Sequence, residues 1–366
     1  MQGGPKPKPA IQARTAATFV GSCLHIHLLG PVDIPSSGPG CSIARTRFMG
    51  SSCVPVGRWC TIRGMDYAEA RVAFFQSRSV DAPEPGTTTW RTSARTLRDA
   101  IEPIATICFW AEPAFDRYAD LGMDFLEGYV WGRACVLGEP AGTVVASAFG
   151  VFEPSVVEGL YDAGRSKCSP AAMRATKEAG AVEALRQVLD DPDGLADAVA
   201  VLRRGVAAAD SSGRPMHAGL MSMNWPTSAL GQLWHACTIL REHRGDGHVD
   251  AYVAAGLTGL EANLLTELIV GWEPLAYTAS RGWSVEAMQA GTAALTSKEL
   301  AANGSPTPAG KQLRDEIEAT TDRLMQPVID AMGEDLESLT STLNTWSQQI
   351  VDRGWFPPDP YKRASG

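Results

Sequence analysis

The chain has 366 residues, of which 45% are hydrophobic and 20% charged, and its net charge is −9 at pH 7. This composition can bury a core and excludes a disordered polymer. No apolar run approaches the roughly 18 residues of a membrane-spanning helix. The N-terminus also lacks a basic segment followed by an apolar core and a cleavage site. We therefore expect a cytoplasmic protein without membrane contact.

Charge is distributed unevenly along the chain. Residues 1–100 hold 12 basic against 6 acidic side chains, whereas residues 101–210 hold 9 against 17 and residues 211–366 hold 11 against 18. A large acidic body is repelled by phosphate backbones, so any surface that binds nucleic acid must be small and local. Nucleic acid stays among the candidate partners, but the charge disfavours it.

The N-terminal part differs in composition from the rest. Residues 1–64 are rich in Pro, Gly, Ser, Arg and Cys, contain the breakers PKPKPA and PSSGPG, and show no sustained helical or strand period. Residues 65–95 read as a helix followed by a linker. We expect residues 1–95 to be a disordered extension or a mis-assigned start, with Met65 as one candidate for the true start. A basic arm that touches nucleic acid is the alternative.

Four cysteines are dispersed through the acidic body without a CxxC pair or a metal-ligand spacing, at Cys108, Cys135, Cys168 and Cys237. Free cysteine is often buried as a small hydrophobic residue, and we expect that role here. The sequence therefore predicts neither a metal site nor a cofactor.

From Leu97 onward, apolar residues recur at helical spacing. Helices are predicted over 97–108, 112–121, 124–136, 141–149, 154–161, 170–189, 193–209, 230–240, 248–255, 259–270, 284–301, 311–326 and 336–350. In the last of these, Leu336, Leu339, Leu343, Trp346 and Ile350 follow a near-heptad spacing. Such a seam needs a partner, which is either another part of the chain or a second copy in a homodimer.

The segment after residue 284 has the order of a winged helix. A helix beginning at Ser284 is followed by Asn303-Gly304, which predicts a tight hairpin turn, and then by Thr307-Pro308-Ala309-Gly310 and a long helix. The hairpin would be the wing, and Gly310 would let the chain bend into the long helix. Pro327 should end or kink that helix at Gln326.

Residues 241–248 read Arg-Glu-His-Arg-Gly-Asp-Gly-His and are unusually polar. We expect Gly245 to end one helix and Asp246 to cap the next. On a purely structural interpretation, the arginines pair with Glu242 or Asp250 and the histidines bond to backbone carbonyls. The alternatives are a pocket for a ligand or substrate and a metal site, although the spacing of His243 and His248 matches no standard metal motif.

Several segments resemble a known family. They are Leu233-Trp234-His235-Ala236 with the 240–248 run, Tyr129 to Gly138, and Thr307 to Lys311 with Thr320 to Arg323. With them, residues 97–345 resemble an actinobacterial family of tandem winged-helix, MarR-like proteins. Its members are mostly described as regulators, so the resemblance implies a fold more firmly than an activity.

The helix in the recognition position departs from what a DNA-reading protein needs. Its only charges are Glu286, Lys298 and Glu299, and the turn at 303–306 has none. Phosphate contacts normally come from cations or backbone amides, so DNA binding by this helix is doubtful.

We therefore predict a mainly α fold of two winged-helix-like halves, residues 96–210 and 211–352, packed through long helices, with a small β-hairpin wing and a tail over 353–366. The predicted function is that of a transcriptional-regulator-like protein that binds a small apolar or aromatic ligand between the halves. The alternatives are an enzyme on the same scaffold and a protein-interaction module. The candidate ligand-binding residues are Arg133, His235, Glu242, His243, Arg244, Asp246 and His248.

Overall fold

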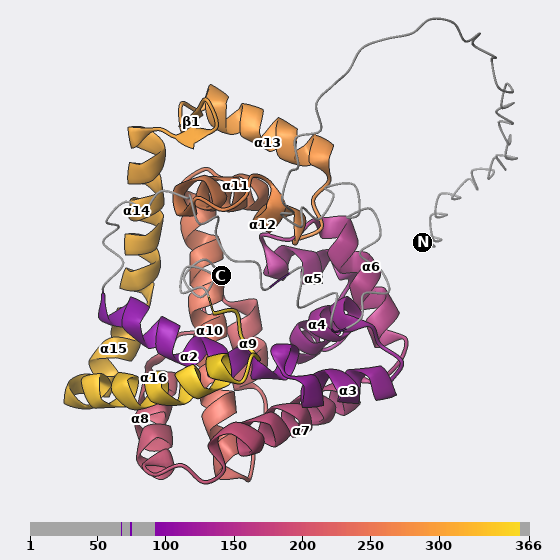
Figure 1. Ribbon diagram of the computed structural model, residues 1–366, viewed down its shortest axis with the longest axis vertical. Helices are drawn as coiled ribbons and strands as arrows, with labels where there is room; N and C mark the ends of the chain where they lie inside the picture. The colour runs from indigo at the N-terminus through magenta and orange to yellow at the C-terminus, as the bar shows by residue number, and fades with distance from the viewer. Residues whose placement is uncertain (1–66, 68–73, 75–91, 359–366) are drawn as a thin grey trace, which may run out of the picture. The chain divides into compact units, whose positions relative to one another are not determined.

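The computed structural model describes Tyr67, Phe74 and residues 92–358, which all belong to the unit that spans residues 54–366. The predictions for residues 1–64 and for a start at Met65 lie outside the described residues. The described part is mainly α-helical with one short hairpin, as the sequence predicts (Figure 1).

Most helices match the predicted ones, but those over 215–221, 276–279 and 326–332 have no predicted counterpart. The first group is α2 (Ser93–Trp110), α3 (Glu112–Asp120), α4 (Phe125–Ala134), η2 (Cys135–Leu137), α5 (Gly142–Phe149), α6 (Pro154–Arg165), α7 (Pro170–Leu189), α8 (Leu195–Ala208) and α9 (Pro215–Met221). The second is α10 (Ala229–Ala254), α11 (Gly259–Val270), α12 (Ala276–Ala279), α13 (Val285–Ser297), β1 (Ala301–Ala302), β2 (Ser305–Pro306), α14 (Pro308–Leu324), α15 (Gln326–Met332), η3 (Gly333–Asp335) and α16 (Leu336–Asp352).

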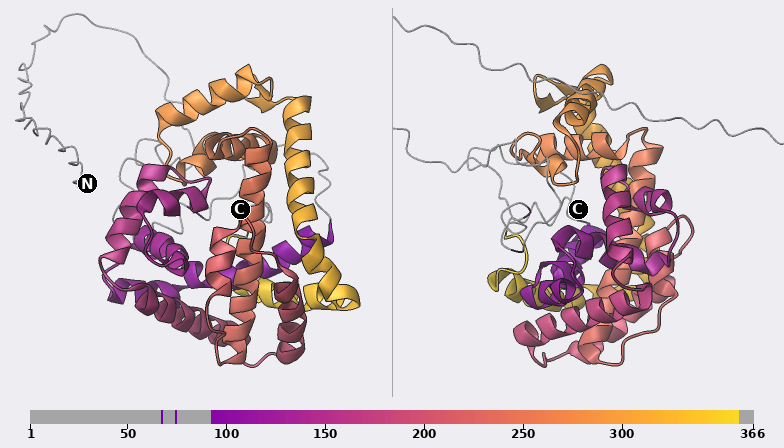
Figure 2. Two further views of the ribbon diagram at one scale, coloured as in Figure 1. Left: turned by 180° about the vertical axis from the view of Figure 1, so that it is seen from behind. Right: turned by 90° about the vertical axis from the view of Figure 1, so that its right-hand side faces the viewer.

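The longest helix, α10, contradicts one prediction. It continues through residues 245–247, so Gly245 does not end a helix and Asp246 does not cap the next one. Both glycines keep negative φ angles. A helix-interior glycine costs about 1 kcal/mol relative to alanine, which is too little to outweigh the packing of α10 against α2, α8, α9 and α14 (Figure 2).

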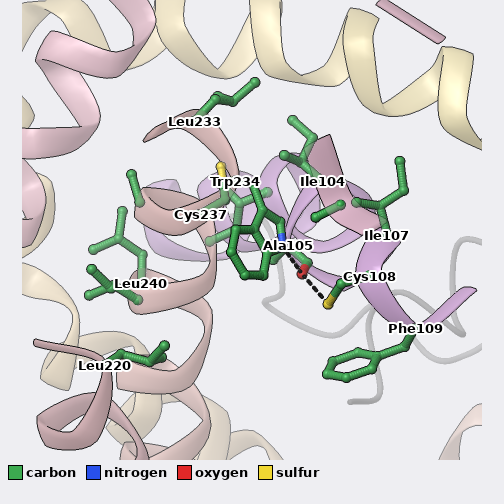
Figure 3. Close-up of a cluster of buried hydrophobic side chains, with 14 of the residues drawn as sticks. Ile104, Ala105, Ile107, Cys108, Phe109, Leu220, Leu233, Trp234, Cys237 and Leu240 are labelled. Atoms are coloured by element: carbon green, nitrogen blue, oxygen red, sulfur yellow. Dashed lines mark hydrogen bonds between the residues drawn. The ribbon is translucent and has the colours of Figure 1, made fainter. Parts of the chain in front are cut away.

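Two hydrophobic clusters meet along α10. The larger contains Phe74 and residues from 94–240 and 325–356, including Leu233 and Trp234. The smaller contains residues from 251–317. In the larger cluster the indole Nε1 of Trp234 donates to the carbonyl of Ala105 in α2 at 3.2 Å (Figure 3). The clusters thus meet within α10, whereas the sequence places the boundary between its two predicted halves at residue 210.

The seam on α16 has a partner within the chain. Leu343 and Ile350 are fully buried, and α16 packs along α2. The hydroxyl of Ser347 donates to the carbonyl of Ala100 at 2.6 Å. The apolar face of α16, for which a second copy of the chain was one possible partner, is therefore covered by α2.

The segment α13–β1–β2–α14 has the predicted order of a helix, a hairpin turn and a long helix. The hairpin pairs Ala301 with Pro306 and Ala302 with Ser305. Asn303 and Gly304 have φ angles of 51° and 73°, as a two-residue primed turn requires. The predicted role of Gly310 is wrong, because it lies in the first turn of α14 and a Cβ there would lie 2.0 Å from the carbonyl oxygen of Leu300. Close approach, not a bend, requires this glycine.

Two residues of the predicted extension contact the body. The Tyr67 hydroxyl donates to the carbonyl of Trp110 at 2.5 Å, and the ring of Phe74 lies 5.5 Å from that of Phe125. Phe74 is buried. These contacts place the beginning of the packed body before residue 95.

Within the described residues, no single helix is long and apolar enough to cross a membrane. In the part of the chain that the structure describes, α10 and α11 taken together meet that test, and they are bent by 98° relative to one another.

Candidate functional site: a charged cavity beside α10

A cavity of about 110 Å³ lies beside α10, and its walls come from α2, α4, α5, α10, α11 and the segment around α12. Of the described residues, five arginines line it: Arg98, Arg133, Arg241, Arg244 and Arg281. The wall also has three carboxylates, Glu102, Glu242 and Asp246. Two tyrosines and two phenylalanines also line it: Tyr129, Tyr277, Phe149 and Phe152.

Five of the seven candidate residues line this cavity: Arg133, Glu242, Arg244, Asp246 and His248. His235 and His243 lie elsewhere. The His235 ring packs edge-on against Trp225 with centroids 5.1 Å apart. His243 Nδ1 lies 3.1 Å from the sulfur of Met325. Both histidines are buried, and burial lowers their pKa values to about 4 and about 3, so both are neutral at pH 7.

Arg133, Glu242, Arg241 and Glu102 form a chain of ion pairs along one wall. Arg133 donates to both oxygens of Glu242, from Nη2 at 2.8 Å and from Nε at 3.3 Å. Arg241 bridges Glu242 at 2.7 Å and Glu102 at 3.0 Å. Burial alone would raise the pKa of Glu242, but the two arginines outweigh it and hold the pKa at about 2.

A second cluster centres on Glu318 of α14. Its carboxylate accepts from Arg95 at 2.6 Å, from Arg244 at 2.8 Å and from Arg314. Burial opposes ionisation, yet these arginines hold the Glu318 pKa well below its usual value. Nearby, His248 Nδ1 lies 3.0 Å from the hydroxyl of Thr321, and burial lowers the His248 pKa to about 3. Its imidazole is therefore neutral at pH 7.

Asp246 differs from the other two carboxylates of the wall in its partners. Its Oδ2 accepts from the backbone N–H of His217 at 3.0 Å. Among the described residues, no lysine, arginine or histidine forms an ion pair with it. Burial raises its pKa to about 7, and the His217 N–H only partly offsets that effect. Asp246 therefore exchanges a proton near neutral pH.

Arg281 differs from the other lining arginines in its partners. Each of the other four lining arginines has a carboxylate within 4 Å, whereas Arg281 has none among the described residues. Its Nη1 donates to the hydroxyl of Ser280 at 2.6 Å, and its guanidinium lies 4.0 Å from the ring centroid of Tyr277. Its buried Nε has no hydrogen-bond partner in the described part of the chain.

Gly245 leaves the α10 backbone bare at the cavity wall. Gly247, two residues on, has a packing role, since a Cβ there would lie 3.2 Å from a methyl of Leu324. Among the described residues, the nearest neighbour of a Cβ at Gly245 would be Glu242 Oε2 at 3.8 Å, and φ is not positive. Neither packing nor backbone conformation therefore requires glycine at position 245.

The sequence interpretation missed Arg98, Glu102, Arg241 and Arg281 as lining residues. A signal for Arg241 exists: on a continuous helix, positions 241, 245 and 248 share one face. Breaking the helix at Gly245 concealed that signal. Arg281 and Glu102 have no comparable local signal, because they approach α10 only through the tertiary fold.

The helix in the recognition position, α13, offers little to a phosphate backbone. Its charged side chains are Glu286 and, at the C-cap, Lys298. Lys298 Nζ is already bonded to Glu261 at 2.7 Å and to the carbonyl of Gly256 at 2.9 Å.

Comparison with known proteins adds one finding. No curated protein and no solved structure matches this chain. A helix-turn-helix family matches residues 94–357, a range that begins in α2 and extends beyond α16. This match covers most of the chain and includes the winged-helix segment and the whole cavity wall. The chain belongs to this helix-turn-helix family.

Proposed function

We propose that this helix-turn-helix protein binds a small molecule in the cavity beside α10. The observation that carries the proposal is Gly245, a helix-interior glycine that lines a cavity surrounded by ion pairs and that has no packing role. Because Gly245 has no side chain, part of the cavity stays open, and a large side chain at this position would fill it. Concave sites with converging polar groups are where small molecules usually bind.

The buried charges support the same proposal. Desolvating an ion pair often costs as much free energy as the attraction returns, so buried pairs are weak devices for stability. Carboxylates with pKa values as different as those of Glu242 and Asp246 are typical of functional sites. We infer that these groups serve a ligand.

The size of the cavity narrows the expected ligand. An engineered cavity of about 150 Å³ holds benzene, so a cavity of about 110 Å³ favours a molecule of a few heavy atoms. The charged wall favours a ligand with a polar group, and Phe149 and Phe152 would contact its apolar part. This proposal replaces the expectation of a purely apolar or aromatic ligand.

We also propose that α13 does not grip duplex DNA in the manner of a regulator. Its one lysine is engaged by Glu261, and the body around it is acidic. The MarR-like resemblance then describes the scaffold, with ligand binding as the retained role.

The proposal is tested by ligand-observed NMR with a library of small anionic, neutral and cationic fragments. Three full-length proteins are compared: the wild type, Gly245→Leu, which places a side chain in the cavity, and Gly245→Ala, which adds only a methyl group. We expect a set of fragments that bind the wild type and Gly245→Ala but not Gly245→Leu. Fragments that bind all three proteins equally, or none that bind at all, would contradict the proposal.

A further inference from the structure

We propose that the ligand of the cavity is a small carboxylate, and that Arg281 pairs with its charge. This inference rests on the proposed function, because it names the chemical class of ligand for the same cavity. It starts from the charges of the wall, where five guanidinium groups face three carboxylates in the described residues.

Among the described residues, Arg281 is the lining arginine that lacks a carboxylate partner. Arg133 and Arg241 pair with Glu242 and Glu102. Arg98 pairs with Asp99, and Arg244 shares Glu318 with two other arginines. In the described part of the chain, the guanidinium of Arg281 has one hydrogen-bond acceptor, the hydroxyl of Ser280, and its buried Nε has none. A buried N–H donor that has no acceptor is unfavourable, and a bound anion would supply the missing acceptor. A carboxylate matches the two-pronged donor geometry of a guanidinium.

The guanidinium is also held in place. The aromatic rings of Tyr277 and Phe152 lie 4.0 and 5.7 Å from it. The α12 segment that carries Tyr277 is fixed by Glu267 of α11, whose carboxylate accepts from the backbone N–H and the hydroxyl of Thr278, both at 2.9 Å. A cation positioned in this way before binding loses little conformational freedom when a ligand arrives.

The rest of the wall favours an anion as well. With its pKa near 7, Asp246 is partly protonated at neutral pH, and His248 is neutral, so the cations of the wall outnumber the ionised carboxylates. The carboxylates of Glu102 and Glu242 are already occupied by arginines. They repel an incoming anion less than free carboxylates would.

The test is calorimetric titration of the full-length protein at pH 6 with isobutyrate, with isobutyramide, which has the same shape without the charge, and with inorganic phosphate. We expect isobutyrate to bind at least about tenfold more tightly than isobutyramide. Arg281→Gln should weaken isobutyrate binding by at least about tenfold, and Arg281→Lys, which keeps the charge but not the fork, by less.

The matched control is Arg203→Gln. Arg203 also lies over an aromatic ring, that of Trp225 at 3.8 Å, and forms no ion pair with a described residue, but it does not line the cavity. Its substitution should leave isobutyrate binding unchanged. Melting curves of all variants verify that each is folded.

Equal binding of acid and amide, unchanged binding in Arg281→Gln, binding of phosphate alone, or no binding of isobutyrate would each overturn the inference. The fragment experiment separates this failure from failure of the proposed function. If neutral fragments are lost in Gly245→Leu while isobutyrate does not bind, the cavity is a binding site and only the anionic class is wrong.

Discussion

Arg133 and Glu242 lie 109 residues apart in the sequence, and they meet in a two-point ion pair with an Nη2–Oε2 distance of 2.8 Å. The pair joins α4 to α10 at the wall of the cavity. The guanidinium also lies 4.5 Å from the ring centroid of Phe149, so the cation is held by charge and by an aromatic face.

Removing one partner of this pair should be worse than removing both. Arg133→Met leaves Glu242 with Arg241 alone in a buried setting, and we expect a loss of about 3 kcal/mol in the free energy of unfolding. The double variant Arg133→Met/Glu242→Met keeps the Arg241–Glu102 pair and should recover part of that loss. Urea denaturation of the wild type, both single variants and the double variant measures the coupling. Strictly additive effects would show that the pair contributes no interaction energy.

Substitution by alanine should change the stability of the fold in opposite directions at Gly245 and Gly180. Gly245→Ala adds a methyl group in open space and improves helix propensity, so it should stabilise the fold by up to about 1 kcal/mol. Gly180→Ala, in the interior of α7, places a Cβ 2.8 Å from the Cα of Ala114 and should destabilise the fold by about 1–3 kcal/mol. Thermal melting measures both. Destabilisation by Gly245→Ala would reveal a packing role that the structure does not show.

Asp246 should make stability depend on pH. Its pKa is about 7 in the folded protein, above the ordinary value of 3.8, so between these values the folded chain holds a proton that the unfolded chain has released. Stability from this group therefore falls as pH rises from about 4 through about 7. Asp246→Asn removes the effect and should be the more stable protein at pH 8, by at most about 4 kcal/mol.

The buried histidines have the opposite effect on the pH dependence of stability, and this effect is the same in the wild type and in Asp246→Asn. Burial lowers the pKa values of His217, His235, His243 and His248 to about 3–4, so stability is lost as pH falls below about 6.5. Taking the difference between Asp246→Asn and wild type cancels this contribution. A difference that stays constant between pH 4 and pH 8 would show that Asp246 has an ordinary pKa.

The contribution of the N-terminal part to stability should differ on the two sides of residue 65. A chain that begins at Met65 should melt within a few degrees of the full chain, because residues 1–64 are rich in helix and strand breakers. By contrast, Phe74→Ala should cost about 3 kcal/mol, since this ring is buried against Phe125 and Trp110. A loss of more than about 2 kcal/mol on removing residues 1–64 would refute the first expectation.

Duplex DNA should bind weakly near physiological salt. Lys298 at the C-cap of α13 is paired with Glu261, and residues 101–366 are strongly acidic. Fluorescence anisotropy with the gene's own upstream region measures the affinity. A sequence-selective complex with nanomolar affinity would contradict this prediction and indicate an ordinary DNA-binding regulator.

The sequence predicted the elements whose signals are local. The helix over 170–189 begins at Ser169-Pro170, where the serine hydroxyl caps it, and the structure has the same bounds. The hairpin turn at Asn303-Gly304 follows from the preference of these two residues for positive φ. Pro327 lies in the first turn of α15, just after the predicted break.

The candidate site was predicted only in part, because its geometry is not local. The weak conformational preference of Gly245 predicts a helix end, whereas burial along both halves of α10 keeps the helix continuous. The Glu318 carboxylate accepts hydrogen bonds from Arg95, which is 223 residues away in the sequence, and from Arg244, which is 74 residues away. No spacing rule in the sequence can indicate such pairs, so the run at 241–248 was found but its partners were not.

The central claim, that the cavity beside α10 holds a ligand, is tested most directly by the mass of the folded protein. Native mass spectrometry of the full-length chain, purified gently from the cells that produce it naturally, should show a small added mass that disappears on denaturation. Gly245→Ala expressed in the same cells should retain this mass, and Gly245→Leu should lose it while remaining folded. A wild-type protein that carries no added mass, or an added mass that persists in Gly245→Leu, would contradict the account.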